Sequence, residues 1–161
     1  MTRLVIVLSV ALALSVHAVT LAQTRPDFSG TWRLNVGKSG PNVAGNTPNI
    51  PFPSQIVVKQ TPTDISVEST SVRQQPISAV YKLDGSKVTV QVPSGISETG
   101  DAKLDGGNLL INSRRSFSSP AGDVVVEFKE VWSLGGNVLT IQKTRTQSGD
   151  SSTEKAVYDK L

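Results

Sequence analysis

Apolar and polar positions alternate with a period of two along most of the chain from residue 23 onward, in runs rich in Val, Ile, Leu and Thr. No window of this part keeps apolar residues at the 3.6 spacing of a helix. Gly, Pro, Asp and Asn separate the runs, as expected for turns between strands. The pattern predicts ten strands, at residues 28–34, 54–60, 63–71, 77–83, 87–92, 96–104, 108–117, 124–134, 138–145 and 152–159.

Four short connections indicate how these strands are joined. Thr61-Pro62, Asp84-Gly85-Ser86, Asp105-Gly106-Gly107 and Gly135-Gly136 each suit a hairpin turn. Consecutive strands joined in this way lie antiparallel, in an up-and-down meander. An open sheet would expose two edges, and closing the sheet into a barrel removes them. We therefore expect an all-β protein, with residues 23–161 forming one antiparallel barrel.

The alternation also predicts which residues face one another inside the last four strands. If Gly135-Gly136 is a two-residue turn, Trp132 faces Leu139 and Glu130 faces Ile141. A slip of one residue would turn the apolar side chains to the wrong face, so the register is constrained. The other predicted pairs are Leu109–Trp132, Ile111–Glu130, Arg115–Val126, Tyr158–Leu139, Ala156–Ile141 and Glu154–Lys143.

Residues 36–53 form the one long irregular stretch, with Gly and Pro at seven of its positions. Such a composition is incompatible with a helix and disfavours a strand. Loops of this length are commonly lids, binding segments or disordered, and these alternatives stay open. In a meander this loop falls at the same end as 72–76, 93–95, 118–123 and 146–151, opposite the tight turns. The barrel is thus expected to have a closed end and a mouth surrounded by loops.

Residues 1–22 differ from the rest, because Arg3 is their only charge and residues 4–16 are apolar except for Ser9 and Ser15. With the small residues around Ala22, this pattern predicts a helical signal peptide that is cleaved on export, so the domain is expected to be periplasmic or secreted. The alternative is an uncleaved membrane anchor. Ser9, Ser15, His17 and Thr20 make the stretch too polar for a good spanning helix, and we expect no stable anchor after cleavage.

Cleavage would also change the chemistry that the domain can perform. His17 is the only histidine, so residues 23–161 contain no His, Cys or Met. Imidazole and thiolate groups are then missing for catalysis, metal ligation and haem ligation. We expect no catalytic residues, no metal site, no cofactor and no enzymatic activity. The remaining net charge is about +2 (15 Lys and Arg against 13 Asp and Glu) without a basic run, so nucleic acid is not expected as a partner.

The predicted rows bring several chemically interesting side chains toward the mouth. Arg115 and Arg145 have no acidic partner there, whereas Lys143 has Glu154 opposite and Glu130 on the diagonal. The two arginines could reach solvent, pair with an acid elsewhere, or hold an anionic headgroup, since a guanidinium matches carboxylate and phosphate geometry. The candidate ligand-binding residues are Arg115, Arg145, Tyr158, Phe128, Lys143 and Trp132, of which Trp132 and Tyr158 also suit the core.

A family likeness is carried by the two ends of the domain. Phe28-Ser29-Gly30-Thr31-Trp32-Arg33-Leu34-Asn35 resembles the Gly-X-Trp opening strand of the lipocalins and fatty-acid-binding proteins, the calycin barrels. Ala156-Val157-Tyr158-Asp159-Lys160 resembles the closing strand of fatty-acid-binding proteins, where an Arg-X-Tyr pair holds the ligand carboxylate. Tyr158 matches, but Ala156 replaces the arginine, and the two-helix lid is replaced by 36–53. With Lys38-Ser39 and Asp84-Gly85, the chain is similar to small exported lipocalin-like proteins of soil bacteria.

The resemblance implies a barrel that binds a small hydrophobic or amphiphilic molecule, which could be anionic. A second hypothesis is an envelope protein-interaction module with a packed interior, which would use loops 36–53 and 118–123. An enzyme on the same frame would have to use Glu130, Lys143 or Tyr158, and is the least favoured of the three.

Overall fold

The computed structural model describes residues 25–43, 50–71, 74–92, 96–120 and 122–161. The predicted signal peptide, 1–22, lies outside these residues. In the described part the only helical element is one 3-10 turn, η1 (Val36–Lys38). The strands are β1 (Gly30–Leu34), β2 (Gln55–Gln60), β3 (Asp64–Ser71), β4 (Gln74–Lys82), β5 (Val88–Val90), β6 (Ser97–Asp105), β7 (Asn108–Ser119), β8 (Gly122–Gly135), β9 (Val138–Gln147) and β10 (Asp150–Lys160). The ten-strand, all-β prediction is confirmed.

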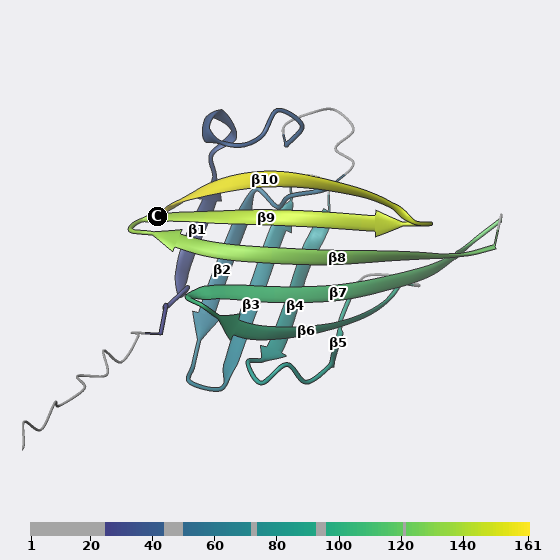
Figure 1. Cartoon of the computed structure of the whole chain (residues 1–161), viewed down its shortest axis with the longest axis horizontal. Coiled ribbons are helices and arrows are strands. Elements are labelled where there is room, and N and C mark those ends of the chain that lie inside the picture. Colours follow the sequence, from purple (N-terminus) through teal and green to yellow (C-terminus); the bar gives the residue numbers. More distant parts are fainter. Residues whose placement is uncertain (1–24, 44–49, 72–73, 93–95, 121) are drawn as a thin grey trace, which may run out of the picture.

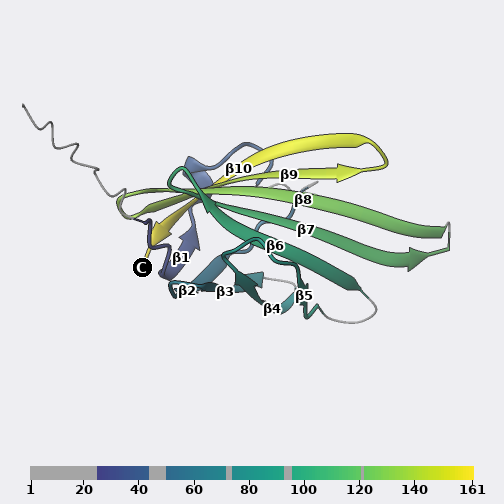
Figure 2. The same ribbon diagram turned by 60° about the horizontal axis from the view of Figure 1, so that its bottom comes forward.

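The strands form one antiparallel sheet that curls into a nearly closed barrel. Its order is β4-β3-β2-β1-β10-β9-β8-β7-β6-β5, so the meander is joined where β1 pairs with β10. In the described part, the sheet edges β4 and β5 are linked by an isolated bridge between Ser78 on β4 and Gln91, the residue after β5. Figures 1 and 2 show β1–β4 crossing the layer formed by β6–β10. The side chains between these two layers form the core.

The register agrees with the prediction at two of the three ladders it covered. Leu109 pairs with Trp132 across β7 and β8, and Tyr158 pairs with Leu139 across β9 and β10. The predicted β8–β9 pairs are wrong, because Trp132 faces Ile141.

The error comes from the position of the turn. Its two residues are Gly136 and Asn137, with Gly135 still paired to Val138. Gly136 has a φ of +63°, the conformation that the first position of such a hairpin turn requires. The shift of two residues changes every partner but keeps each side chain on its predicted face.

Aromatic side chains fill the end of the barrel that has the tight turns. Phe28 and Trp132 pack edge to face, with ring centroids 6.3 Å apart. Trp32 is 1% exposed, and its indole Nε1 donates to the Phe28 carbonyl oxygen at 2.9 Å. Trp32 is therefore a core residue, and with Phe28 and Trp132 it belongs to the buried core at this end of the barrel.

The segment after β1 continues along β10 beyond the last strand pair. The Asn35 amide donates to the Val157 carbonyl and the Gly40 amide to the Lys155 carbonyl, each at 2.8 Å. In return the Val157 amide donates to Ser39 Oγ at 2.9 Å. These bonds satisfy edge groups of β10 that β1 is too short to reach.

The described parts of 36–53 are also held by burial. Val43 is 7% exposed and Ile50 only 1%. The Tyr158 hydroxyl donates to the Pro53 carbonyl at 2.9 Å. Residues 36–43 and 50–53 are therefore packed against the barrel, while the intervening residues lie outside the described part.

Gly100 offers a test of how closely β4 and β6 pack across the barrel. A Cβ at Gly100 would lie 2.8 Å from Tyr81 Cε1 and 2.9 Å from the Asn112 carbonyl oxygen. We expect Gly100→Ala to lower the free energy of unfolding by about 1–3 kcal/mol, because the backbone and the ring must both shift. Gly135→Ala is the matched control, since its Cβ would meet nothing within 4 Å. Urea denaturation measures both, and equal effects would contradict the packing described.

Asp159 offers a test of the junction between β1 and β10. It accepts hydrogen bonds from Asn35 Nδ2 at 2.5 Å and Lys38 Nζ at 2.9 Å, and these lower its pKa. A folded pKa below the unfolded value means that its contribution is present above about pH 4 and is lost as the pH falls through the folded pKa. Asp159→Asn should therefore be less stable than the parent at pH 7, with the difference shrinking below pH 4.

The control for this experiment is Asp150→Asn, at the other end of β10, which changes the net charge equally but removes none of these bonds. Chemical denaturation at pH 7 and at pH 3 gives the comparison. If Asp159→Asn loses the same free energy of unfolding at both pH values, the charge of Asp159 does not contribute to stability.

Candidate functional site

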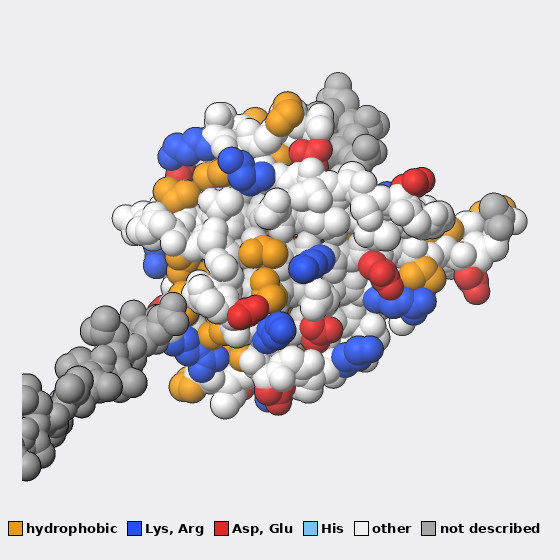
Figure 3. All heavy atoms as spheres, in the orientation of Figure 1, with side chains coloured by type: hydrophobic (Ala, Val, Ile, Leu, Met, Phe, Trp, Pro, Cys, Tyr) orange, Lys and Arg blue, Asp and Glu red, His pale blue; other side chains and the backbone are white. Residues whose placement is uncertain are grey.

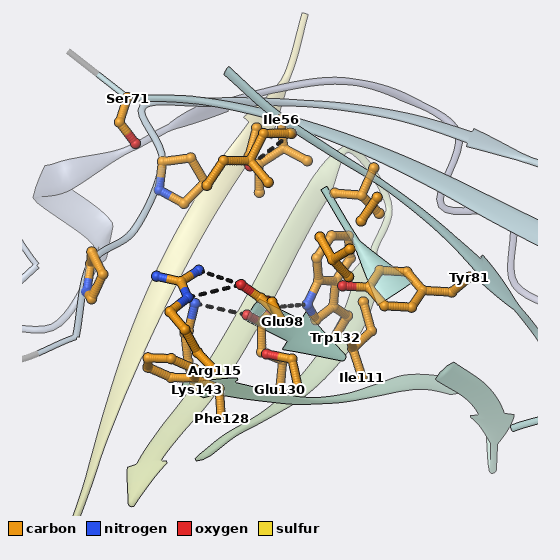
Figure 4. Close-up of a pocket in the computed structure, with 18 residues that line it drawn as sticks. Ile56, Ser71, Tyr81, Glu98, Ile111, Arg115, Phe128, Glu130, Trp132 and Lys143 are labelled. Atoms are coloured by element: carbon orange, nitrogen blue, oxygen red, sulfur yellow. Dashed lines mark hydrogen bonds and ion pairs between the residues drawn. The ribbon is translucent and has the colours of Figure 1, made fainter. Parts of the chain in front are cut away.

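A cavity of about 130 Å³ lies inside the barrel. Pro51, Pro53 and Ser71 are among its lining residues, so it lies toward the end with the long loops. The wall from β2–β5 is mainly apolar, with Ile56, Val67, Ile77, Ala79 and Val90. The wall from β6–β9 carries the charges, on Glu98, Arg115, Glu130 and Lys143. The cavity is thus amphiphilic, with one apolar side and one charged side (Figure 4).

The first charged pair joins β6 to β7. Glu98 lies directly opposite Arg115, and its Oε2 accepts from Arg115 Nε at 2.8 Å and lies 2.7 Å from Nη2. The Glu98 side chain is 7% exposed and that of Arg115 26%. Because a buried carboxylate is costly without a partner, the two contacts from Arg115 to this one oxygen stabilise Glu98 inside the barrel.

The second charged pair joins β8 to β9. Glu130 Oε1 lies 2.9 Å from Lys143 Nζ, and Glu130 Oε2 accepts from Trp132 Nε1 at 2.7 Å. The two charged side chains are 18% and 15% exposed. Both oxygens of this carboxylate are used within the protein.

Phe128 lies beside both cations. Arg115 Cζ is 5.7 Å and Lys143 Nζ 4.7 Å from the centre of its ring, within the range of cation–π attraction. Phe52 adds a second ring 6.0 Å from Lys143 Nζ. The aromatic faces thus help to stabilise charges that have left water.

Tyr81 faces this charged wall from β4. Burial raises the pKa of its hydroxyl, and the nearby carboxylates of Glu130 and Glu98 raise it further. The hydroxyl therefore stays protonated and can donate a hydrogen bond. Figure 4 shows it directed toward the ion pairs.

Four of the six predicted binding residues come together at the cavity. They are Arg115, Phe128, Trp132 and Lys143. Of the three interpretations left open for Arg115, the structure shows pairing with an acid on another strand. The role of these residues in binding a ligand stays a prediction.

The remaining two predicted residues, Arg145 and Tyr158, lie outside the cavity lining. Tyr158 is fully buried and holds Pro53 through its hydroxyl. Arg145 is half-buried and bonds to Gln147, and it makes no ion pair with any residue in the described ranges.

Sequence reasoning missed Glu98 and Tyr81, for different reasons. Glu98 could have been found, because a two-residue turn at Gly106-Gly107 pairs it with Arg115 by counting along the strands. Tyr81 could not, since its place opposite the charged wall depends on how the barrel closes around β4.

The cavity offers little for covalent chemistry. Its two carboxylates are each bonded to a cation. Within the described residues, no group of three His, Cys, Asp or Glu side chains converges as a metal site would require. The arrangement is suited to holding a molecule by shape and hydrogen bonding.

No family model matches the chain, and no curated protein resembles it significantly in sequence. Among solved structures it is similar to the zebrafish ileal bile acid-binding protein in complex with cholic acid, with a TM-score of 0.58 and 13% identity over 83% of this chain and 98% of that one. It is also similar to a secretory abundant heat soluble protein of Ramazzottius varieornatus, with a TM-score of 0.57 and 16% identity over 83% and 95%. A looser match is the fatty-acid-binding protein of Manduca sexta, with a TM-score of 0.42 and 19% identity over 65% and 71%.

These likenesses and the ten-strand topology define the fold as a calycin-like barrel, as the sequence motifs predicted. The shared shape covers nearly the whole length of the first two proteins. At such low identity it establishes the fold, and the function must be argued from the cavity.

Glu98 provides a test of the charged wall. We expect Glu98→Ala to lower the free energy of unfolding by about 3 kcal/mol, the lower end for a broken buried pair, because Arg115 keeps some exposure. The double variant Glu98→Leu/Arg115→Met should lose less free energy of unfolding, since it leaves no unpaired charge. Chemical denaturation of the three proteins gives the ranking. If the double variant is the least stable, the ion pair itself is a net source of stability and the desolvation argument is wrong.

Proposed function

We propose that this chain is an exported lipocalin-like protein whose barrel binds a small hydrophobic or amphiphilic molecule. The observation that carries the proposal is the interior cavity with its apolar and charged walls. One protein of the same fold, the zebrafish ileal bile acid-binding protein, is described with cholic acid bound. Export, to the periplasm or the medium, rests on the pattern of residues 1–22 alone.

Binding without catalysis is part of this proposal. In the cavity, Glu98 is engaged by Arg115 and Glu130 by Lys143 and Trp132, so neither carboxylate is poised as a general base. A ligand would therefore be held rather than transformed. In the described residues no helix is long and apolar enough to cross a bilayer.

The protein-interaction hypothesis has weaker support. It would be favoured by a filled interior and by a contiguous apolar patch on the loops. The large apolar side chains exposed in the described residues are Val36 on η1, Val80 on β4, Phe117 on β7 and the last residue, Leu161. Figure 3 shows charges of both signs scattered over the visible face, without a large apolar area.

Two neighbouring positions on β4 provide a test: a larger side chain at one of them fills the cavity, and the same side chain at the other serves as the control. Ala79 lines the cavity and Val80 is 56% exposed on the outer face. We expect Ala79→Phe to bind phenol, a neutral single-ring probe, at least 10-fold more weakly, while Val80→Phe binds it like the parent. Isothermal titration calorimetry measures the affinities, and native mass spectrometry of protein purified from its own host looks for a bound small molecule.

The proposal fails if the parent binds no probe, carries no bound molecule and is clearly more stable than Ala79→Phe, because a core without free space cannot accept the larger ring without strain. That combination would describe a barrel with a packed interior.

A further inference from the structure

We propose that the cavity selects a compact, uncharged ligand: a single-ring molecule such as an aromatic alcohol, whose polar group hydrogen-bonds beside Tyr81 and Glu98. This inference rests on the proposed function and names the class of molecule that the same cavity would take. Size, charge balance and free polar atoms each point to it.

Size sets the first limit. The cavity measures about 130 Å³. An apolar cavity of about 150 Å³ engineered into another protein binds benzene, which gives the scale for a molecule of one ring. A long alkyl chain or a steroid would require the barrel wall or the 50–53 segment to move.

Charge balance sets the second limit. The lining contains two cations and two carboxylates, and each cation is bonded to a carboxylate. An anionic ligand that displaced Glu98 from Arg115 would leave a buried carboxylate without its partner, because the Glu98 side chain is only 7% exposed. An anion that used the remaining N–H groups of Arg115 would lie beside the Glu98 carboxylate and be repelled by it. Either arrangement weakens the binding of an anion. A neutral ligand avoids both effects.

Two polar atoms in the cavity are free to receive such a ligand. Arg115 contacts one oxygen of Glu98, leaving Oε1, and no described residue bonds to the Tyr81 hydroxyl. All fully buried side-chain nitrogen and oxygen atoms of the described part have partners, so these two atoms face open space. They offer a ligand hydroxyl one acceptor and one donor, since Tyr81 stays protonated.

The apolar part of the ligand would have a matching surface. Phe128 and Trp132 stand on the charged wall, and Ile56, Val67 and Ile77 face them from β2, β3 and β4. A ring lying between these walls would be buried on both faces, while its hydroxyl pointed toward Tyr81. This division matches a ligand with one polar group.

Arg145 is the basis of the competing arrangement. It is half-buried on β9, outside the cavity lining, and no described acid pairs with it. A carboxylate could be held there with a short apolar tail in the cavity. The experiment must therefore distinguish a neutral ligand from an anion bound through Arg145.

Three probes of one shape test the charge preference: 4-methylphenol, 4-methylbenzoate and 4-methylbenzylammonium, at pH 7, by isothermal titration calorimetry with the folded barrel domain. The phenol is neutral at this pH, because the pKa of such a hydroxyl is about 10. We expect it to bind at least 10-fold more tightly than either ion. Dodecanoate, added as a long-chain probe, should bind no better than 4-methylbenzoate.

Glu98→Gln then changes the charge of the cavity without changing its shape. It should raise the affinity for 4-methylbenzoate at least 10-fold, because Arg115 is left without a counter-charge. Asp101→Asn is the matched control: it lies on the same strand, changes the net charge equally, and Asp101 bonds to Asn112 outside the cavity lining. It should leave all three affinities unchanged. Circular dichroism checks that each variant is folded. If Glu98→Gln does not fold, the ratios of the three probe affinities in the parent protein decide the test.

The outcomes separate this inference from the proposed function. Preference of the parent for 4-methylbenzoate, lost in Arg145→Gln, would overturn the inference and support the competing arrangement, with the binding function intact. Equal binding of all three probes would overturn it as well. If none of the probes binds the parent and Ala79→Phe is clearly less stable than the parent, the interior is packed, and both the inference and the proposed function are overturned.

Discussion

Charges inside the barrel must find partners inside the barrel, and this constraint organises both the structure and its chemistry. Glu98 and Glu130 point inward from β6 and β8, where little water can compensate their charge. Each is matched by a cation on the next strand, at the directly opposite position. The register of the ladders therefore decides whether the interior is electrically balanced. A slip of two residues would keep the apolar pattern but separate both pairs.

The same pairs give the cavity its polar wall. Glu98, Arg115, Glu130 and Lys143 line it opposite the apolar side chains of β2–β5. At the opposite end the buried aromatic side chains of Trp32, Phe28 and Trp132 occupy the interior. The barrel is thus divided into a packed end and a polar end. The segment 50–53, held by Tyr158, covers the polar end in part.

Much of this was predictable from alternation and turn chemistry. The β7–β8 and β9–β10 ladders follow from matching apolar faces, and Arg115, Phe128, Trp132 and Lys143 were placed near one another for this reason. The β8–β9 pairs were not, because Gly135-Gly136 and Gly136-Asn137 both suit a two-residue hairpin turn by residue type. Only the geometry of the strand ends distinguishes them.

The sequence by itself determined the fold class, the order of the strands and the face on which each side chain lies, because a period of two and the positions of Gly and Pro are local properties. The tertiary structure decided which inward charges meet and where space remains. Tyr81 stands opposite Glu98 and Glu130, and 35–40 runs along β10, only because the sheet closes on itself. Closure depends on the twist and curvature that all ten strands accumulate together, and it cannot be predicted from any local sequence pattern.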